Sequence, residues 1–157
     1  MIGNDIVDLA LAKKESNWKR KGYLDKIFTK NEQLLIASAE DSEIMVWNLW
    51  SRKEAVYKIY NRKTGVRAFL PLKIECSEVA SEIGIVSCLG ETYYTKTEIT
   101  KQFVNTVAVL QKSDFNKILV LEKNTKIKKL DGIPFTELND QIVSISHHGK
   151  FKEIVSL

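Results

Sequence analysis

Asp5 is the first residue of the chain that is a candidate for a functional role, because a carboxylate is unusual in its surroundings. It lies inside the apolar, strand-like stretch Gly3-Asn4-Asp5-Ile6-Val7. A carboxylate buried there without a partner would cost free energy. It therefore lies at the surface, caps a neighbouring helix or binds a metal ion, and this stretch alone leaves all three interpretations open.

A second candidate lies in the stretch from Trp50 to Lys58, which mixes charges with aromatic rings. Residues three and four apart are neighbours on a helix, so Glu54 shares a face with Trp50, Tyr57 and Lys58. One interpretation is a surface ion pair between Glu54 and Lys58, which contributes only about 0.3–0.5 kcal/mol. The other is a carboxylate and an ammonium group that act on a substrate.

The third candidate is the stretch Ser144-Ile145-Ser146-His147-His148. Side chains alternate along a strand, so His147 and His148 are expected to point in opposite directions and not to bind one metal ion together. We expect one of them to work alone, as a hydrogen-bond donor or a phosphate contact. A histidine with a purely structural hydrogen bond is the alternative.

Helices are predicted in the first part of the chain. The opening, 2–9, reads as a short strand that runs into a helix, followed by a polar, basic helical stretch. Thr29 and Glu32 have the spacing of a capping box, which predicts a helix that ends near residue 39. Apolar residues recur at helical spacing over 44–61 and predict the longest helix.

Strands are predicted after Gly65, where the sequence becomes rich in β-branched and aromatic residues. The expected strands are 69–76, 83–89, 91–99, 103–110, 117–122, 142–146 and 151–155. Early helices and late strands favour an α+β fold, in which a mostly antiparallel sheet packs against an N-terminal helical layer. We expect one domain over residues 1–157, since no repeat or linker interrupts the chain.

Composition favours a soluble globular protein, with 44% hydrophobic and 28% charged residues. No apolar run approaches the ~20 residues that span a bilayer, and the first residues lack a signal-peptide pattern. We therefore expect a cytoplasmic protein without a membrane partner. Cys76 and Cys88 lie in separate apolar runs without metal-ligand spacing, so we predict two buried, reduced thiols.

The formal net charge is +4, and basic residues cluster at 13–21, around Trp18, and at 123–129. Such clusters suit an anionic partner, which could be a nucleic acid, a phosphorylated cofactor or an acidic protein surface. The chain has no zinc-ligand spacing, RNP-like strand motif or glycine-rich clamp. A small nucleic-acid-binding module is therefore only a remote alternative, and we expect no nucleic-acid partner.

Together, the three stretches resemble the signature of the 4'-phosphopantetheinyl transferase superfamily. That signature combines Gly-x-Asp-Ile, Trp-x-x-Lys-Glu-Ala-x-x-Lys and Ser-x-Ser-His. Here the matching segments are Gly3 to Ile6, Trp50 to Lys58 and Ser144 to His147. Their order is that of the single-domain holo-acyl-carrier-protein synthase type, and segments 23–32 and 65–71 also resemble the family.

The resemblance implies Mg²⁺-dependent transfer of 4'-phosphopantetheine from coenzyme A to a serine of an apo acyl- or peptidyl-carrier protein, with release of adenosine 3',5'-bisphosphate. It implies that Asp5 and Glu54 bind the metal, that Glu54 accepts the serine proton and that Lys58 neutralises the transferring phosphate. Some relatives have a third acid where this chain has Val7. Asp8 falls on another face and is not expected to be a ligand.

The same resemblance implies a set of residues that contact coenzyme A. They are His147, Ser146, Lys53, Lys58, Gly65 and Arg67. In the family, one copy of each motif per chain implies that the histidine comes from a neighbouring subunit, so we expect a homo-oligomer, with a trimer favoured. The basic stretch 13–21 is expected to be a helix that attracts the acidic carrier protein, although a solvated basic face is the alternative. A catalytically silent relative that binds coenzyme A or a carrier protein is the alternative function.

Overall fold

Strand β1 (Ile2–Asp8) forms one edge of a five-stranded antiparallel sheet in the computed structural model, which describes residues 1–157. The strand order is β1-β5-β4-β3-β2. The other strands are β2 (Ile74–Glu78), β3 (Gly84–Cys88), β4 (Glu91–Ile99) and β5 (Phe103–Val109). Each residue of β1 has a partner in β5, so this pairing fixes the position of Asp5 opposite Thr106.

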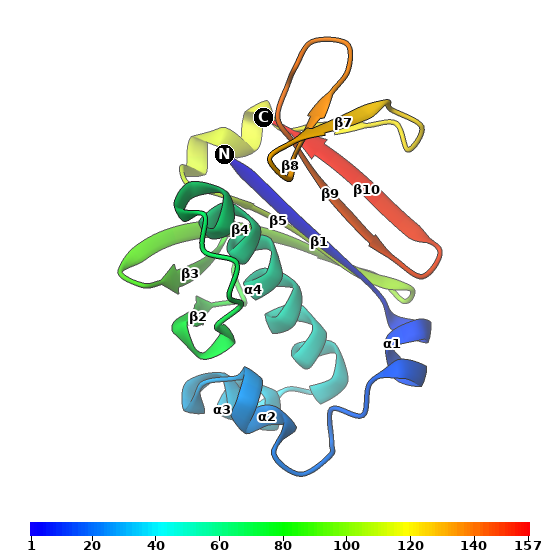
Figure 1. Cartoon of the computed structure of the whole chain (residues 1–157). Helices are drawn as coiled ribbons and strands as arrows, with labels where there is room; N and C mark the ends of the chain where they lie inside the picture. Colours follow the sequence, from blue (N-terminus) through cyan, green and yellow to red (C-terminus); the bar gives the residue numbers. More distant parts are fainter.

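Helix α4 (Ser42–Thr64) lies across one face of this sheet (Figure 1) and carries the second motif. Asp41 caps its first turn by accepting a hydrogen bond from the Ile44 N–H, and Gly65 ends it in a left-handed conformation. Its inner side chains form the main core with the sheet. They include Val46, Leu49, Ala55, Val56 and Ile59, all fully buried.

Gly3 lets β1 and α4 approach each other closely. A Cβ atom at Gly3 would overlap the backbone carbonyl oxygen of Ala55. Ala55 is itself fully buried at this contact. The glycine of the first motif and the alanine of the second therefore meet, and this contact brings together the elements that carry Asp5 and Glu54.

Three short helices, α1 (Leu9–Glu15), α2 (Tyr23–Ile27) and α3 (Lys30–Ser38), complete the helical layer. The predicted capping box is present. The Thr29 hydroxyl accepts a hydrogen bond from the Glu32 N–H, and the Glu32 carboxylate accepts one from the Thr29 N–H. The basic stretch 13–21 is only partly helical, because α1 ends at Glu15 and a turn follows, so the expectation of a positive helix there is wrong.

Strands β9 (Val143–His148) and β10 (Phe151–Ser156) form a second sheet with β6 (Leu119–Leu121), in the order β6-β10-β9. A separate hairpin consists of β7 (Ile127–Leu130) and β8 (Ile133–Thr136).

This hairpin is not among the expected strands, although its sequence contains a signal for it. Asp131-Gly132 forms the turn with positive φ at both residues, as two-residue hairpins favour. The first expected strand also differs, since it starts only at Ile74. Pro71 begins a short 3-10 segment, η1 (Pro71–Lys73), and a second such segment, η2 (Lys112–Lys117), lies before β6.

The α+β class, with antiparallel sheets beside a helical layer, is confirmed. Cys76 and Cys88 are free and buried, as predicted. Burial is the main cause that raises the pKa of the Cys76 thiol, which keeps it protonated. None of the helices combines the length and the apolar character needed to cross a bilayer.

Candidate functional site

Side chains of β9, rather than a backbone ladder, join this strand to the free edge of β1. The Ser144 Oγ accepts a hydrogen bond from the Asn4 N–H at 3.0 Å. The Ser146 Oγ accepts one from the Ile6 N–H at 2.9 Å. Every second N–H of β1 faces away from β5, which explains why the serines recur with a spacing of two.

His148 continues this pattern, and His147 does not. The His148 Nδ1 accepts a hydrogen bond from the Asp8 N–H at 2.8 Å, so the structural interpretation applies to this histidine. The Asp8 side chain caps helix α1 by accepting hydrogen bonds from the N–H groups of Ala10 and Leu11. His147 follows Ser146 directly, so its side chain points to the other face of β9. There it lines two cavities.

The Ser146 side chain is in direct contact with Asp5. Its Oγ donates a hydrogen bond to the Asp5 Oδ1 at 3.1 Å, and the side chain is buried. A hydroxyl group has a single proton, and here that proton is already in use. Ser146 therefore positions Asp5, and its expected contact with coenzyme A stays a prediction.

Replacing Ser146 by alanine is expected to lower the free energy of unfolding by about 1–3 kcal/mol, because the buried Ile6 N–H would lose its acceptor. Urea unfolding followed by circular dichroism measures this loss. Ser77→Ala is the matched control, since the Ser77 hydroxyl donates only to an exposed carbonyl group. Equal unfolding midpoints for the two variants would contradict the assignment.

Lys58 joins α4 to β1 and β9. Its Nζ donates to the carbonyl oxygen of Asn4 at 2.5 Å and to that of Ile145 at 3.1 Å. The same nitrogen lies 4.0 Å from the Asp5 Oδ1. Its close contacts are thus with the strands, so the interpretation of Lys58 as half of a surface ion pair with Glu54 does not apply.

Asp5 and Glu54 are neighbouring carboxylates in a poorly solvated place. Burial raises the pKa of Asp5 to about 7, with Lys58 opposing and Glu54 adding to the shift. Burial also raises the pKa of Glu54, although the positive charge of Lys58 acts to lower it. Burial lowers the pKa of Lys58, although both carboxylates act in the other direction. Two such carboxylates beside a single ammonium group favour a further cation.

The two acids fit a magnesium ion better than a metal held entirely by protein. Mg²⁺ is commonly bound by one or two carboxylates, with water and phosphate oxygens as its other ligands. No cluster of three or more metal-binding side chains is present. Asp5 and Glu54 are therefore a fitting donor pair for an ion that also binds a phosphorylated ligand.

The larger of the two cavities beside His147 has a volume of about 700 Å³ and is strongly basic. It lies between the C-terminal half of α4, strand β9 and the β7–β8 hairpin. Its charged side chains are Lys58, Arg62, Arg67, Lys129 and Asp131, so basic groups outnumber the acid. Gly65 also lines it. Such a cavity suits a polyanion.

The smaller cavity, of about 340 Å³, is lined by Asp5 and by aromatic side chains, among them Tyr23, Trp47 and Trp50. His147 lines this cavity as well as the larger one. Asp5 therefore lines the aromatic cavity and Lys58 lines the basic one, while Glu54 lines neither of them. Lys58 and His147 line the same cavity of one chain, and the expected place of the site at a subunit interface stays a prediction. The oligomeric state itself stays a prediction.

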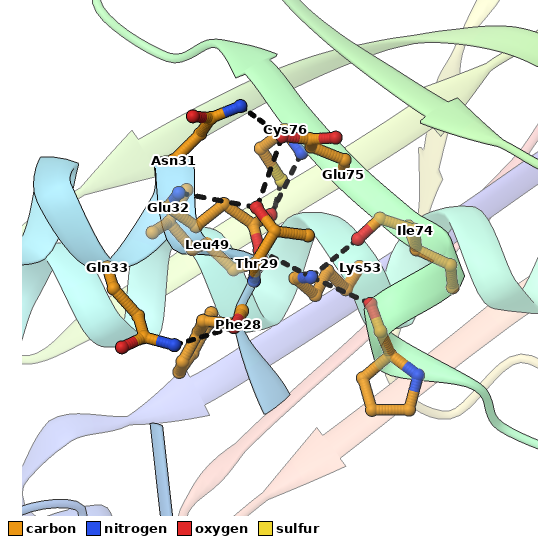
Figure 2. Close-up of polar contacts among 11 residues, drawn as sticks. Phe28, Thr29, Asn31, Glu32, Gln33, Leu49, Lys53, Ile74, Glu75 and Cys76 are labelled. Carbon is orange, nitrogen blue, oxygen red and sulfur yellow. Dashed lines mark hydrogen bonds and ion pairs between the residues drawn. The ribbon is translucent and has the colours of Figure 1, made fainter. Parts of the chain in front are cut away.

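Lys53 lies outside both cavities, so its expected place in the coenzyme A pocket is wrong. Its Nζ lies 2.6 Å from the Glu32 Oε2 and donates to the carbonyl oxygens of Pro71 at 2.8 Å and Ile74 at 2.5 Å (Figure 2). The side chains of Lys53 and Glu32 are fully buried. Adjacent residues of a helix point in different directions, so the side chains of Lys53 and Glu54 lie on different sides of α4.

Arg62 and Lys129 join the basic cavity without being predicted from the motifs. Arg62 lies one helical turn after Lys58 on the same face, and its guanidinium donates to the Ile2 carbonyl oxygen at 2.7 Å. The i, i+4 spacing from Lys58 is the signal that points to it. For Lys129, the signal is the Asp131-Gly132 pair, which predicts a hairpin turn directly after the strand that contains this lysine.

Comparison with known proteins agrees with this geometry. The model of the 4'-phosphopantetheinyl transferase superfamily matches residues 1–109. Among solved structures, 32 chains match. One is Helicobacter pylori holo-acyl-carrier-protein synthase in complex with coenzyme A, with a TM-score of 0.54 and 19% identity, covering 71% of this chain and 100% of that chain. No curated protein sequence matches. At this identity the structural likeness supports the fold.

Proposed function

Because the chain belongs to the 4'-phosphopantetheinyl transferase superfamily, we propose that it transfers the 4'-phosphopantetheine group of coenzyme A to a serine hydroxyl of an apo carrier protein. The other product is adenosine 3',5'-bisphosphate. One observation carries the proposal: the Asp5, Glu54 and Lys58 group adjoins a basic cavity of about 700 Å³. The proposed setting is the cytoplasm.

The basic cavity supports coenzyme A as the donor. Coenzyme A carries a diphosphate and a 3'-phosphate, and the cavity offers Lys58, Arg62 and Arg67 along one face of α4 and the segment after it. Charge-assisted hydrogen bonds to phosphate are stronger than neutral ones. In this proposal, His147 contacts the nucleotide where the two cavities meet.

Asp5 and Glu54 would hold a Mg²⁺ ion against the diphosphate. When bound, this ion supplies positive charge to phosphoryl oxygens and lowers the pKa of both carboxylates. Ser146 holds the Asp5 carboxylate in place through its hydrogen bond. Asp5 and Glu54 are partly buried, which weakens the screening of their charges by water.

The chain's own groups then have separate parts in the transfer. Glu54 accepts the proton of the carrier serine as the oxygen attacks the β-phosphate. Lys58 is held by two backbone carbonyl groups, so its charge is in position before the substrate arrives. It stabilises the charge that develops on the phosphoryl oxygens.

A direct test is to mix the protein with Mg²⁺, coenzyme A and an apo carrier protein, and to weigh the carrier by mass spectrometry. We expect the carrier to gain one phosphopantetheine group and the gain to disappear with EDTA, because the two carboxylates alone would repel the phosphates. Binding of coenzyme A without transfer would refute the enzyme and favour a silent relative. Transfer that is unaffected by EDTA would refute the metal.

A further inference from the structure

Three N–H groups of β1 donate hydrogen bonds to side chains of β9. The first two acceptors are the hydroxyl groups of Ser144 and Ser146. The third is the Nδ1 atom of His148, which lies 2.8 Å from the Asp8 nitrogen. A hydroxyl oxygen can accept a hydrogen bond at any ordinary pH, whereas an imidazole nitrogen accepts one only while it carries no proton. His148 is therefore the one acceptor of this series that titration can remove.

The hydrogen bond from Asp8 fixes the protonation state of the ring. A backbone N–H group cannot accept a hydrogen bond, so the Nδ1 atom of His148 carries no proton and the ring proton lies on Nε2. The Nε2 atom lies 3.6 Å from the Glu15 Oε2 atom of helix α1. A second proton, on Nδ1, would place two donors against each other at Asp8. The protonated ring therefore has to turn away from this N–H group.

Asp8 connects the ring to helix α1. Its buried carboxylate caps α1 by accepting hydrogen bonds from the N–H groups of Ala10 and Leu11. The same carboxylate accepts a hydrogen bond from the Lys150 N–H, in the β9–β10 turn, at 3.3 Å. A Cβ atom at Gly149 in this turn would overlap the carboxylate. The turn is thus fitted closely against the start of α1, and Figure 1 shows the two next to each other.

Charges of both signs surround the imidazole of His148. Glu15 of α1 and Asp8 of β1 are acidic, and Lys150 of the turn is basic. Further titratable side chains line the same cavity as His148, namely Asp5, Tyr23 and His147. Opposite charges nearby stabilise a protonated imidazole. The neutral ring therefore accepts from the Asp8 N–H, and the charged ring is attracted to the Glu15 carboxylate.

Helix α1 contributes to two surfaces that the transfer would use. Lys13 and Lys14 in its last turn begin the basic stretch 13–21, which is expected to attract the carrier protein. Ser16 follows α1 directly and lines the smaller cavity together with Asp5. None of the residues that line the larger, basic cavity belongs to α1. Movement of α1 would therefore change the surface offered to the carrier protein and not the one offered to coenzyme A.

We propose that His148 is a positioning residue whose neutral imidazole holds α1 in the place where the helix binds the carrier protein, and that protonation of the imidazole releases α1. This inference rests on the proposed function for the identity of the partner. It predicts that acid weakens carrier binding through His148, without a matching effect of His148 on coenzyme A binding. The contact between His148 and Asp8 can itself be tested without a carrier protein.

Nuclear magnetic resonance tests the switch in the protein alone. At about pH 8, the Nδ1 signal of His148 is expected at the position of an unprotonated ring nitrogen. Lowering the pH to about 5.5, across the range in which histidine ordinarily changes charge, should shift the amide signals of Asp8, Ala10 and Leu11. In His148→Asn, an amide oxygen can replace the Nδ1 acceptor and does not titrate, so these signals should no longer follow the pH. A proton on Nδ1 at neutral pH, or amide signals that are the same in both proteins at every pH, would overturn the inference.

Transfer kinetics test the effect on the carrier protein. His148→Ala leaves the Asp8 N–H without an acceptor, and we expect the KM for the carrier to rise roughly tenfold, with kcat and the KM for coenzyme A changed by less than about twofold. His148→Asn should restore the carrier KM. It should also abolish the rise in carrier KM that the unaltered protein shows as the pH falls from about 8 to about 6.

The asparagine variant is the matched control for the pH profile. Other titratable groups, among them Asp5 and His147, are present in all three proteins, so they cannot cause a difference between the profiles. Equal carrier KM values for His148→Ala and His148→Asn would contradict the positioning role. So would a pH profile of His148→Asn that matches the profile of the unaltered protein.

The two proposals fail in different ways. If no carrier protein is modified but the amide signals of α1 follow the titration of His148, the proposed function is refuted and the contact between His148 and α1 stands. If transfer occurs and all three proteins have the same carrier KM at each pH, the proposed function stands and the positioning role of His148 is refuted.

Discussion

Replacing Glu54 by glutamine is expected to lower the rate of phosphopantetheine transfer by roughly 10²–10³-fold or more, the usual cost of losing one charge that stabilises a transition state. Glutamine has nearly the same shape, but it cannot accept the serine proton and binds Mg²⁺ weakly. Transfer rates at saturating coenzyme A and carrier protein measure the effect.

Glu43→Gln is the matched control for this variant. Glu43 lies in the first turn of the same helix, about three turns before Glu54 and therefore far from Asp5 and Lys58. We expect this control to transfer at the unaltered rate. Circular dichroism and thermal unfolding must show that Glu54→Gln is folded. A folded Glu54→Gln protein that transfers as fast as the control would contradict the role given to Glu54.

Replacing Lys53 by alanine is expected to lower the free energy of unfolding by about 3–5 kcal/mol, the cost of leaving one partner of a buried ion pair without the other. The Glu32 carboxylate would keep its hydrogen bonds from Thr29 and Cys76 but lose its counter-charge. The carbonyl groups of Pro71 and Ile74 would lose a donor as well. Because these contacts join α3, α4 and β2, the loss is expected to be global. Urea unfolding measures it.

Lys30→Ala gives the contrast in the same helical layer. Lys30 pairs with Asp25 at 3.0 Å, but the side chains are 84% and 64% exposed, so we expect a change of about 0–1 kcal/mol. The double variant Glu32→Gln with Lys53→Met should be less destabilised than the two single changes predict together, since it removes both buried charges. Additive losses would show that the two charges do not interact.

Much of the fold follows from neighbours in the sequence. The capping box depends on Thr29 and Glu32, three residues apart, and α4 depends on an apolar spacing that repeats at every turn. These signals are local, so the sequence alone determines them. The same holds for the family motifs, which identify Asp5, Glu54 and Lys58 as residues of one site.

Only the tertiary structure decided what several of those residues do. Ser146 accepts a hydrogen bond from a strand 140 positions away, and no local pattern reveals that its oxygen is already in use. Lys53 and Glu54 are adjacent, yet one is buried against Glu32 and the other faces the acidic site, because a helix turns its neighbours to different sides. The hairpin that brings Lys129 to the cavity is likewise set by long-range packing. Such contacts depend on which surfaces meet when the chain folds, and that information is absent from the spacing of residues along it.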